Sequence, residues 1–160
     1  MANLQSFISS GDRDQGGKEM NIAFIAHDKR KELLVQFCVA NCGTFARHKL
    51  CATAATGKLI ADATGLEIQR FMSGHHGGDQ QIAARIANKE VDILFFFRDP
   101  SVTETEIFDG ATLLRLCDVH NIPVATNITT AELIVKALER GDLEWKEPIL
   151  TTGKRKKNIY

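Results

Sequence analysis

The stretch VDILFFFRDP, residues 91–100, is a run of apolar side chains that ends abruptly in charged residues. A short, continuous apolar run of this kind is typical of a strand in a parallel sheet that is covered on both faces. Four further runs can be assigned in the same way, although the second and third of them are less hydrophobic: NIAFIAH (21–27), KLCATA (49–54), EIQRFMS (67–73) and IPVAT (122–126). We therefore predict five strands.

Between these runs, apolar residues recur three and four positions apart, which is the spacing of a helix with one buried face. The spacing occurs in four groups: Leu33, Leu34, Phe37 and Cys38; Ile82, Ala83, Ile86 and Ala87; Leu113, Leu114, Leu116 and Cys117; Leu133, Ile134, Ala137 and Leu138. Alternating strands and helices predict a single-domain α/β fold, a three-layer sandwich around a five-stranded, mainly parallel sheet of the flavodoxin-like or Rossmann-like type.

The chain has 160 residues, of which 44% are hydrophobic, and this is enough for one domain with a substantial core. We expect that domain to span residues 21–145. Residues 1–20 lack periodicity and are expected to form a disordered extension. Residues 146–160 carry the basic run Lys154 to Lys157 and are expected to form a mobile tail.

Charge, the length of the apolar runs and cysteine content indicate which partners and which compartment the chain favours. Twenty Lys and Arg residues balance twenty Asp and Glu residues, so no global field favours nucleic acid or an acidic membrane surface. The apolar runs are too short to span a membrane. The four cysteines form no CxxC pair and follow no signal-like segment, which favours reduced thiols and a cytoplasmic location.

Polar residues follow every predicted strand, at the edge where open parallel sheets bind ligands. Two of these turns, TAATGK (53–58) and SGHHGG (73–78), combine hydroxyl groups with backbone N–H groups at a helix start. That combination favours a phosphate group, although TAATGK can equally be read as a simple helix cap. It is not a nucleotide P-loop, because Ala52 and Leu59 occupy positions where that motif needs Gly and Ser or Thr.

Three carboxylates, Asp28, Asp79 and Asp99, follow different strands. Carboxylates that converge near a phosphate site are suited to proton abstraction next to a carbonyl group. The alternative is that one of them caps a helix and two are surface acids. Nucleophilic hydrolysis fits less well, because the chain has no GxSxG turn.

A metal site at the histidines is a further alternative. His75 and His76, with His27 and Asp79, include residue types that bind zinc. Adjacent histidines cannot easily direct their rings at one ion, and zinc sites usually draw on spaced motifs such as HExxH. We therefore predict no metal and no cofactor.

Five stretches together resemble the methylglyoxal synthase family over roughly residues 21–142. They are IAFIAHDKRK, ATGKLI, ATGLEIQRFMSGHHGGDQQIAARI, VDILFFFRDP and LLRLCDVHNIPVATNITTAEL. The resemblance implies a homohexameric, metal-free carbon–oxygen lyase that converts dihydroxyacetone phosphate to methylglyoxal and inorganic phosphate. Inorganic phosphate is then a product and a possible inhibitor.

The resemblance also assigns roles to individual residues. Asp79 becomes the general base that removes a carbon-bound proton to give an enediolate, and His27 becomes a substrate contact. The acids that the family keeps around its active site fall on Asp28, Asp99 and Asp109. The phosphate cradle falls on Lys31, Thr53, Ala54, Ala55, Thr56, Ser73 and Gly74.

This sequence departs from the family at two places. The phosphate loop reads TAATG where the family has TGTTG, so Ala54 and Ala55 replace a glycine and a threonine. The missing hydrogen bond is worth about 1.5–3 kcal/mol unless another group replaces it. The second departure is Glu106, which aligns with the histidine that the family uses to move protons between substrate oxygens. Either Glu106, if protonated, takes that role, or His75 or His76 does, where the family more often has Pro and an apolar residue.

A non-catalytic function is the competing interpretation. The same fold resembles the regulatory domain of carbamoyl phosphate synthetase, which binds effectors, so this chain could be a phosphorylated-metabolite-binding regulatory module. The intact GGDQQ motif, residues 77–81, favours the enzyme.

Overall fold

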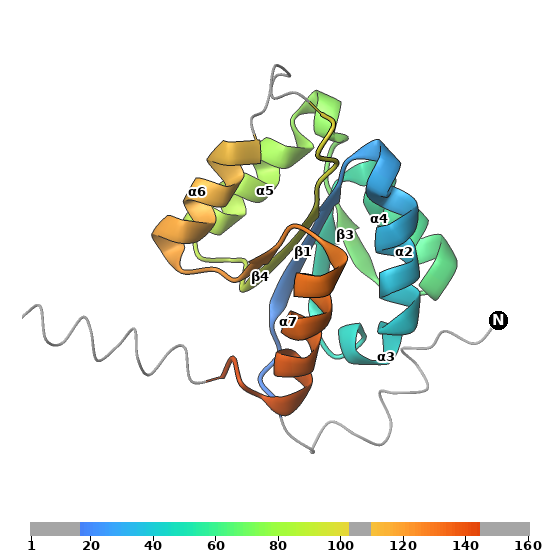
Figure 1. Ribbon diagram of the computed structural model, residues 1–160, viewed down its shortest axis with the longest axis vertical. Helices are drawn as coiled ribbons and strands as arrows, with labels where there is room; N and C mark the ends of the chain where they lie inside the picture. The colour runs from blue at the N-terminus through green and yellow to red at the C-terminus, as the bar shows by residue number, and fades with distance from the viewer. Residues whose placement is uncertain (1–16, 103–109, 145–160) are drawn as a thin grey trace, which may run out of the picture.

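The computed structural model describes residues 17–102 and 110–144, apart from the side chain of His75. Its centre is a five-stranded sheet in which all pairings are parallel (Figure 1). The strands are β1 (Asn21–Ala26), β2 (Lys49–Ala52), β3 (Ile68–Arg70), β4 (Ile93–Phe97) and β5 (Val124–Ala125). Each lies within a predicted segment but is shorter than predicted, so the expected mainly parallel sheet is confirmed as fully parallel.

The strand order is β3-β2-β1-β4-β5. The chain therefore builds the sheet outward from β1 in one direction and then returns to place β4 on the other side of β1. The order reverses between β1 and β4. In open parallel sheets, the crevice for a ligand lies at the carboxyl ends of the strands beside such a reversal.

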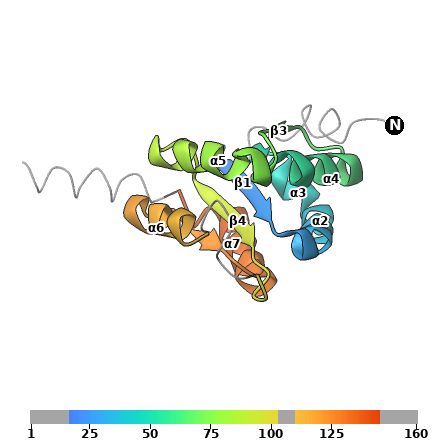
Figure 2. The same ribbon diagram turned by 90° about the horizontal axis from the view of Figure 1, so that it is seen from above.

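Helices cover both faces of the sheet. One face carries α2 (Lys31–Ala40), the short α3 (Cys42–Phe45), α4 (Ala54–Thr64) and α7 (Ile128–Arg140). The other carries α5 (Gly78–Ala87) and α6 (Gly110–His120). In Figure 2, α6 and α2 lie on opposite sides of β1 and β4. Helix α4 is not among the four segments that the spacing predicts.

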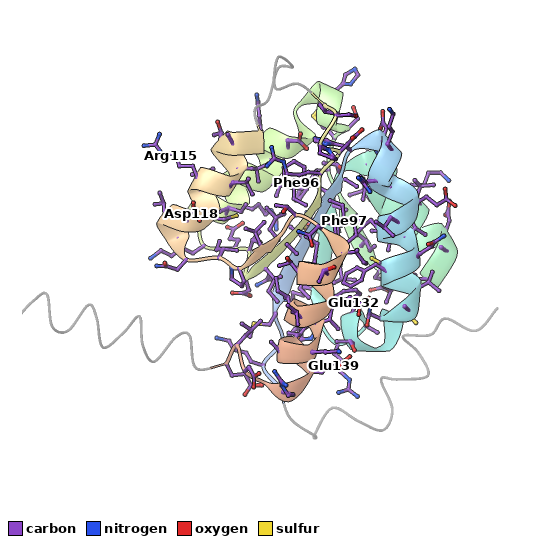
Figure 3. The ribbon with its side chains drawn as sticks, viewed as in Figure 1. Phe96, Phe97, Arg115, Asp118, Glu132 and Glu139 are labelled. Carbon is purple, nitrogen blue, oxygen red and sulfur yellow. The ribbon has the colours of Figure 1, made fainter. Side chains whose placement is uncertain are left out.

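The core is divided into two layers by the alternation of side chains along the strands. Phe24 of β1 and Phe95 of β4 face α2 and α3, where their rings stack at 5.4 Å and Phe45 packs edge-on at 5.2 Å from Phe24. Phe96 and Phe97, which are labelled in Figure 3, belong to opposite layers. Full burial of each such ring contributes about 1.5–3 kcal/mol, so β1 and β4, which end beside the reversal, are firmly held.

The folded domain includes Met20, one residue before the expected boundary. Met20 is buried, and its carbonyl group accepts a hydrogen bond from the N–H group of Lys49 (3.0 Å). Its own N–H group donates to Nδ1 of His48 (2.9 Å). At the other end Leu143 packs against the core. Within residues 17–102 and 110–144, no helix is long and apolar enough to cross a membrane.

Candidate active site

His27 and Asp99 meet where β1 and β4 end side by side. The N–H group of His27 donates to the carbonyl group of Phe97 (3.1 Å), and the N–H group of Asp99 donates to Nδ1 of His27 (2.9 Å). Phe96 packs edge-on against the imidazole, with the ring centroids 5.4 Å apart. Because Nδ1 accepts a hydrogen bond, the neutral ring carries its hydrogen on Nε2 and can donate it to a ligand.

Asp99 is a buried carboxylate bound within its own turn. Its Oδ1 atom accepts hydrogen bonds from the N–H group (3.0 Å) and the hydroxyl group (2.7 Å) of Ser101. These bonds, the backbone one above all, lower the pKa of Asp99 below its ordinary value, with smaller contributions from Lys29 and Arg30. Asp99 therefore stays ionised at neutral pH and is better suited to holding the turn beside His27 than to taking up protons.

Lys31 places a cation at the same edge. The residues after β1 form a 3-10 turn, η1 (Asp28–Arg30), and Lys31 begins α2. Its ammonium group donates to the carbonyl group of Ala26 (3.2 Å) and pairs with the carboxylate of Asp28. The Lys31 side chain is only 18% exposed, whereas that of Asp28 is 81% exposed. The ammonium group is thus fixed at the end of β1, where it can attract an anion.

The N-terminus of α4 lies at the end of β2, the neighbour of β1. The side chain of Thr53, the residue before α4, makes no capping hydrogen bond, and its buried hydroxyl group lies 3.3 Å from the buried hydroxyl group of Thr56. The N–H group of Ala54 donates to the carbonyl group of Met72 (3.3 Å). A helix start of this kind is electropositive and favours phosphate binding. The contact with Met72 joins it to the turn after β3.

The GGDQQ motif forms the end of the turn after β3 and the start of α5, and it places Asp79 next to that turn. Gly77 has a φ of +96°, which only glycine adopts readily. Gly78 lies directly on the Met72 carbonyl group and donates its N–H group to the carbonyl group of Ser73 (2.9 Å). Gln81 accepts a hydrogen bond from the Met72 N–H group through Oε1 (2.8 Å).

Asp79 therefore lies in the first turn of α5, beside Gly74. A methyl group placed on Gly74 would lie 3.5 Å from Oδ1 and 3.6 Å from Oδ2 of Asp79. The turn after β3 is thus bound to both helix starts, that of α4 through Ala54 and that of α5 through Gly78. A phosphate group held at α4 would place its substrate close to the Asp79 carboxylate.

We expect Gly78→Ala to damage this turn. A Cβ atom at Gly78 would lie 1.9 Å from the carbonyl oxygen of Met72, so the backbone has to move. We expect the free energy of unfolding to fall by about 1–3 kcal/mol, measured by urea denaturation, together with a loss of activity. Gly43→Ala in α3 is the control, because nothing lies within 4 Å of a Cβ atom there. Equal stability of both variants would contradict the close packing at Gly78.

The sheet edge thus brings the predicted residues into two neighbouring groups. His27, Asp28, Lys31 and Asp99 gather at the ends of β1 and β4. Residues 53–56, the predicted phosphate loop, gather with Ser73, Gly74 and Asp79 at the ends of β2 and β3. Glu106 and Asp109 lie outside the described residues. No group of three or more His, Cys, Asp or Glu side chains that could hold a metal occurs in the described part of the chain.

Three contributors to the site escape sequence reasoning: Ser101, Gln81 and the backbone of Met72. Ser101 could have been found, because an Asp side chain often binds the N–H group two residues later in a turn. The contacts of Met72 carry no such signal, because they are made by backbone atoms and are independent of side-chain type.

The sequence is similar to known proteins. Residues 35–126 match the family model described as the MGS-like domain. The chain is 58% identical to the methylglyoxal synthase of Caldicellulosiruptor saccharolyticus over 128 residues, which is 80% of this chain and 91% of that protein. It is 53% identical to the methylglyoxal synthase of Oceanobacillus iheyensis over 130 residues, 81% of this chain and 93% of that protein.

A solved structure is similar as well. The crystal structure of methylglyoxal synthase from Elizabethkingia anophelis NUHP1 matches with a TM-score of 0.67 and 41% sequence identity. The match covers 74% of this chain and 78% of that one. Fold and sequence agree, and the chain belongs to the methylglyoxal synthase family.

Proposed function

We propose that this protein is a methylglyoxal synthase, a lyase that converts dihydroxyacetone phosphate to methylglyoxal and inorganic phosphate. The observation that supports this most directly is the position of Asp79, whose carboxylate lies beside Gly74 on a turn joined to the start of α4. A base and an anion site are thereby held next to each other. The reaction needs this arrangement, because the carbon that loses a proton and the carbon that bears the phosphate flank the same carbonyl group.

The first step is removal of a proton from the hydroxyl-bearing carbon. Asp79 takes the proton, and the electron pair of the C–H bond moves through the new C=C bond onto the carbonyl oxygen, which gives an enediolate. The negative charge needs donors that are already in place. Nε2–H of His27 is one, because the Asp99 N–H group holds the opposite ring nitrogen. Lys31 adds a positive charge at the same edge.

The second step breaks the C–O bond to phosphate. The proton of the terminal hydroxyl group first moves to the former carbonyl oxygen. The electron pair left on the terminal oxygen then forms an aldehyde C=O bond, the C=C bond shifts to the carbon that bears the phosphate, and phosphate leaves with the bonding electron pair. The product is the enol of methylglyoxal, which gains a proton at that carbon and loses one from oxygen to become methylglyoxal. The start of α4, Lys31 and the Ser73–Gly74 turn are suited to hold the departing dianion, which favours elimination.

We expect the purified protein to release methylglyoxal and phosphate from dihydroxyacetone phosphate, and chelator to leave the rate unchanged. Both steps need only a base, hydrogen-bond donors and an anion site. The checks are a colorimetric assay for phosphate and a dicarbonyl assay for methylglyoxal, each with and without EDTA. Binding of dihydroxyacetone phosphate by calorimetry without any turnover would favour the regulatory module instead.

We also propose that the enzyme is a homohexamer in the cytoplasm and is inhibited by its product phosphate. The resemblance to the family motivates the assembly. An assembly would bury exposed apolar side chains such as Met72 after β3, Val119 on α6 and Leu133 on α7. These side chains are 53%, 63% and 64% exposed. Light scattering at micromolar concentration measures the mass directly, and a monomer would contradict the assembly.

A further inference from the structure

Ser73 and His76 form a hydrogen-bonded pair at the start of α5. The Oγ atom of Ser73 lies 2.8 Å from Nδ1 of His76. The backbone holds this pair together, because the 3-10 turn η2 (Gly74–His76) returns the chain so that the His76 N–H group donates to the Ser73 carbonyl group (2.9 Å). The N–H group of Gly78 donates to the same carbonyl group. The backbone of the turn therefore holds the His76 imidazole next to the Ser73 hydroxyl group.

The pair lies next to the start of α4. Met72 immediately precedes Ser73, and its carbonyl group accepts the hydrogen bond from Ala54, the first residue of α4. Ser73 thus belongs to the anion site on which the proposed function rests. The α4 side of that site has lost a hydroxyl group, because Ala55 stands where the family has a threonine.

A serine hydroxyl group has one hydrogen and two lone pairs, so its partner decides what it offers to a ligand. If Nδ1 of His76 bears no hydrogen, the hydroxyl hydrogen points at the imidazole, and only lone pairs face an incoming phosphate oxygen. If Nδ1 bears a hydrogen, the imidazole donates to Oγ, and the hydroxyl hydrogen is released toward the ligand. A phosphate dianion selects the second arrangement, because it accepts hydrogen bonds.

We propose that His76 is a positioning residue that directs the Ser73 hydroxyl hydrogen toward the phosphate group of a phosphate monoester. This role rests on the proposed function and extends it to His76, one of the two positions where the resemblance implies that the family more often has Pro and an apolar residue. The donor fixed at Ser73 offsets the hydroxyl group that is missing at Ala55. His76 thus acts through Ser73 and needs no contact with the reacting carbon atoms.

A double-mutant cycle tests this coupling with inorganic phosphate as the probe. We expect Ser73→Ala and His76→Phe each to raise the Kd for phosphate, measured by calorimetry, by about 10- to 150-fold, the range for a hydrogen bond to a charged group. The double variant should bind no more weakly than Ser73→Ala alone, because the effect of His76 passes through Ser73. His120→Phe, at the last turn of α6, is the matched control and should bind phosphate normally.

Three further readouts separate positioning from structural support. His76→Asn should restore most of the affinity, since its amide N–H group can donate from nearly the position of Nδ1. With dihydroxyacetone phosphate, His76→Phe should raise KM by a larger factor than it lowers kcat. A ¹⁵N spectrum of the imidazole should show hydrogen on Nδ1 once phosphate is bound.

Two outcomes of the variant cycle would overturn the proposal. One is an unchanged phosphate Kd in His76→Phe, and the other is a double variant whose loss equals the product of the single losses, because His76 would then bind phosphate directly. The phosphate-binding cycle needs no turnover. If the variants bind phosphate as expected but the wild-type protein does not turn over dihydroxyacetone phosphate, the proposed enzyme activity is refuted and the role of the Ser73–His76 pair is not. A wild-type protein that binds no phosphate would refute both.

Discussion

Replacement of Asp79 by Asn is expected to lower kcat for dihydroxyacetone phosphate by at least about two orders of magnitude, the usual contribution of a positioned general base. Asn keeps the size of the side chain and its capacity for hydrogen bonding but cannot take up the carbon-bound proton. The loss should fall on kcat more than on KM, because in the proposed site the start of α4 and the Ser73–Gly74 turn hold the phosphate group away from Asp79. Initial-rate measurements over a range of substrate concentrations separate the two constants.

Asp118→Asn is a suitable control for this experiment. Asp118 is an exposed carboxylate on α6, and Figure 3 shows it on the outer side of that helix, away from the sheet. Its replacement should leave kcat within about twofold. The rate of exchange of substrate protons with deuterium from D₂O should fall in Asp79→Asn as well, because exchange reports proton removal before elimination. A variant of Asp79 that retains half the wild-type rate would remove this residue from the role of base.

The central strands β1 and β4 were predictable because each is a continuous apolar segment that is buried on both faces of the sheet, whereas β3, at the edge, is mostly exposed. The ends of the strands were less predictable. The segment 49–54 was predicted as strand throughout, but β2 ends at Ala52, and α4 begins at Ala54. Thr53 and Ala54 carry small side chains that suit either structure, so hydrophobicity alone does not mark the boundary. The hydrogen bond from the Ala54 N–H group to the Met72 carbonyl group lies at this boundary, and it forms only in the folded sheet.

The apolar spacing of α4 escaped detection for a related reason, although TAATGK had indicated a helix start there. Its buried residues are Thr56, Gly57 and Ile60, so only one large apolar side chain marks the inner face. Leu59, which a pattern search counts as apolar, is 43% exposed. Small residues on its inner face let α4 lie close to the sheet. A helix whose buried residues are small lacks the regular spacing of large apolar side chains by which helices are recognised.

The site divides in the same way between local and long-range information. That polar residues follow each strand is visible in the sequence, and parallel pairing places them at one edge. The contact between His27 and Asp99, 72 positions apart, depends on β4 being the neighbour of β1, and this order is a property of the assembled sheet. The tautomer of His27 follows from that contact, so it could not be predicted from the sequence. The Ser73–His76 pair is local, yet it depends on a turn whose geometry Gly77 and Gly78 set together.

Replacement of Glu106 by Gln is expected to lower kcat by about 10²- to 10⁴-fold, the range for a general acid or base. The resemblance to the family implies that Glu106 takes the position of its proton-moving histidine, and Glu106 lies outside the described residues. As an anion it would repel both the phosphate and the enediolate, so the carboxyl group has to be protonated to work. Activity should then fall as the pH rises and this proton is lost, and a pH–rate profile of kcat measures the effect.

The alternative is that His75 or His76 moves the proton, and the substitutions separate the two cases. If Glu106 does the work, Glu106→Gln is severe, and His76→Asn retains most of kcat because His76 serves only to orient Ser73. If a histidine does it, Glu106→Gln is mild, and His75→Ala or His76→Ala is severe. Glu106→His would raise the rate only where glutamate is the poorer shuttle, by at most about 10²- to 10⁴-fold. We favour Glu106, because His76 is already bound to Ser73 through Nδ1, and a Glu106→Gln enzyme with an undisturbed rate and pH profile would rule that choice out.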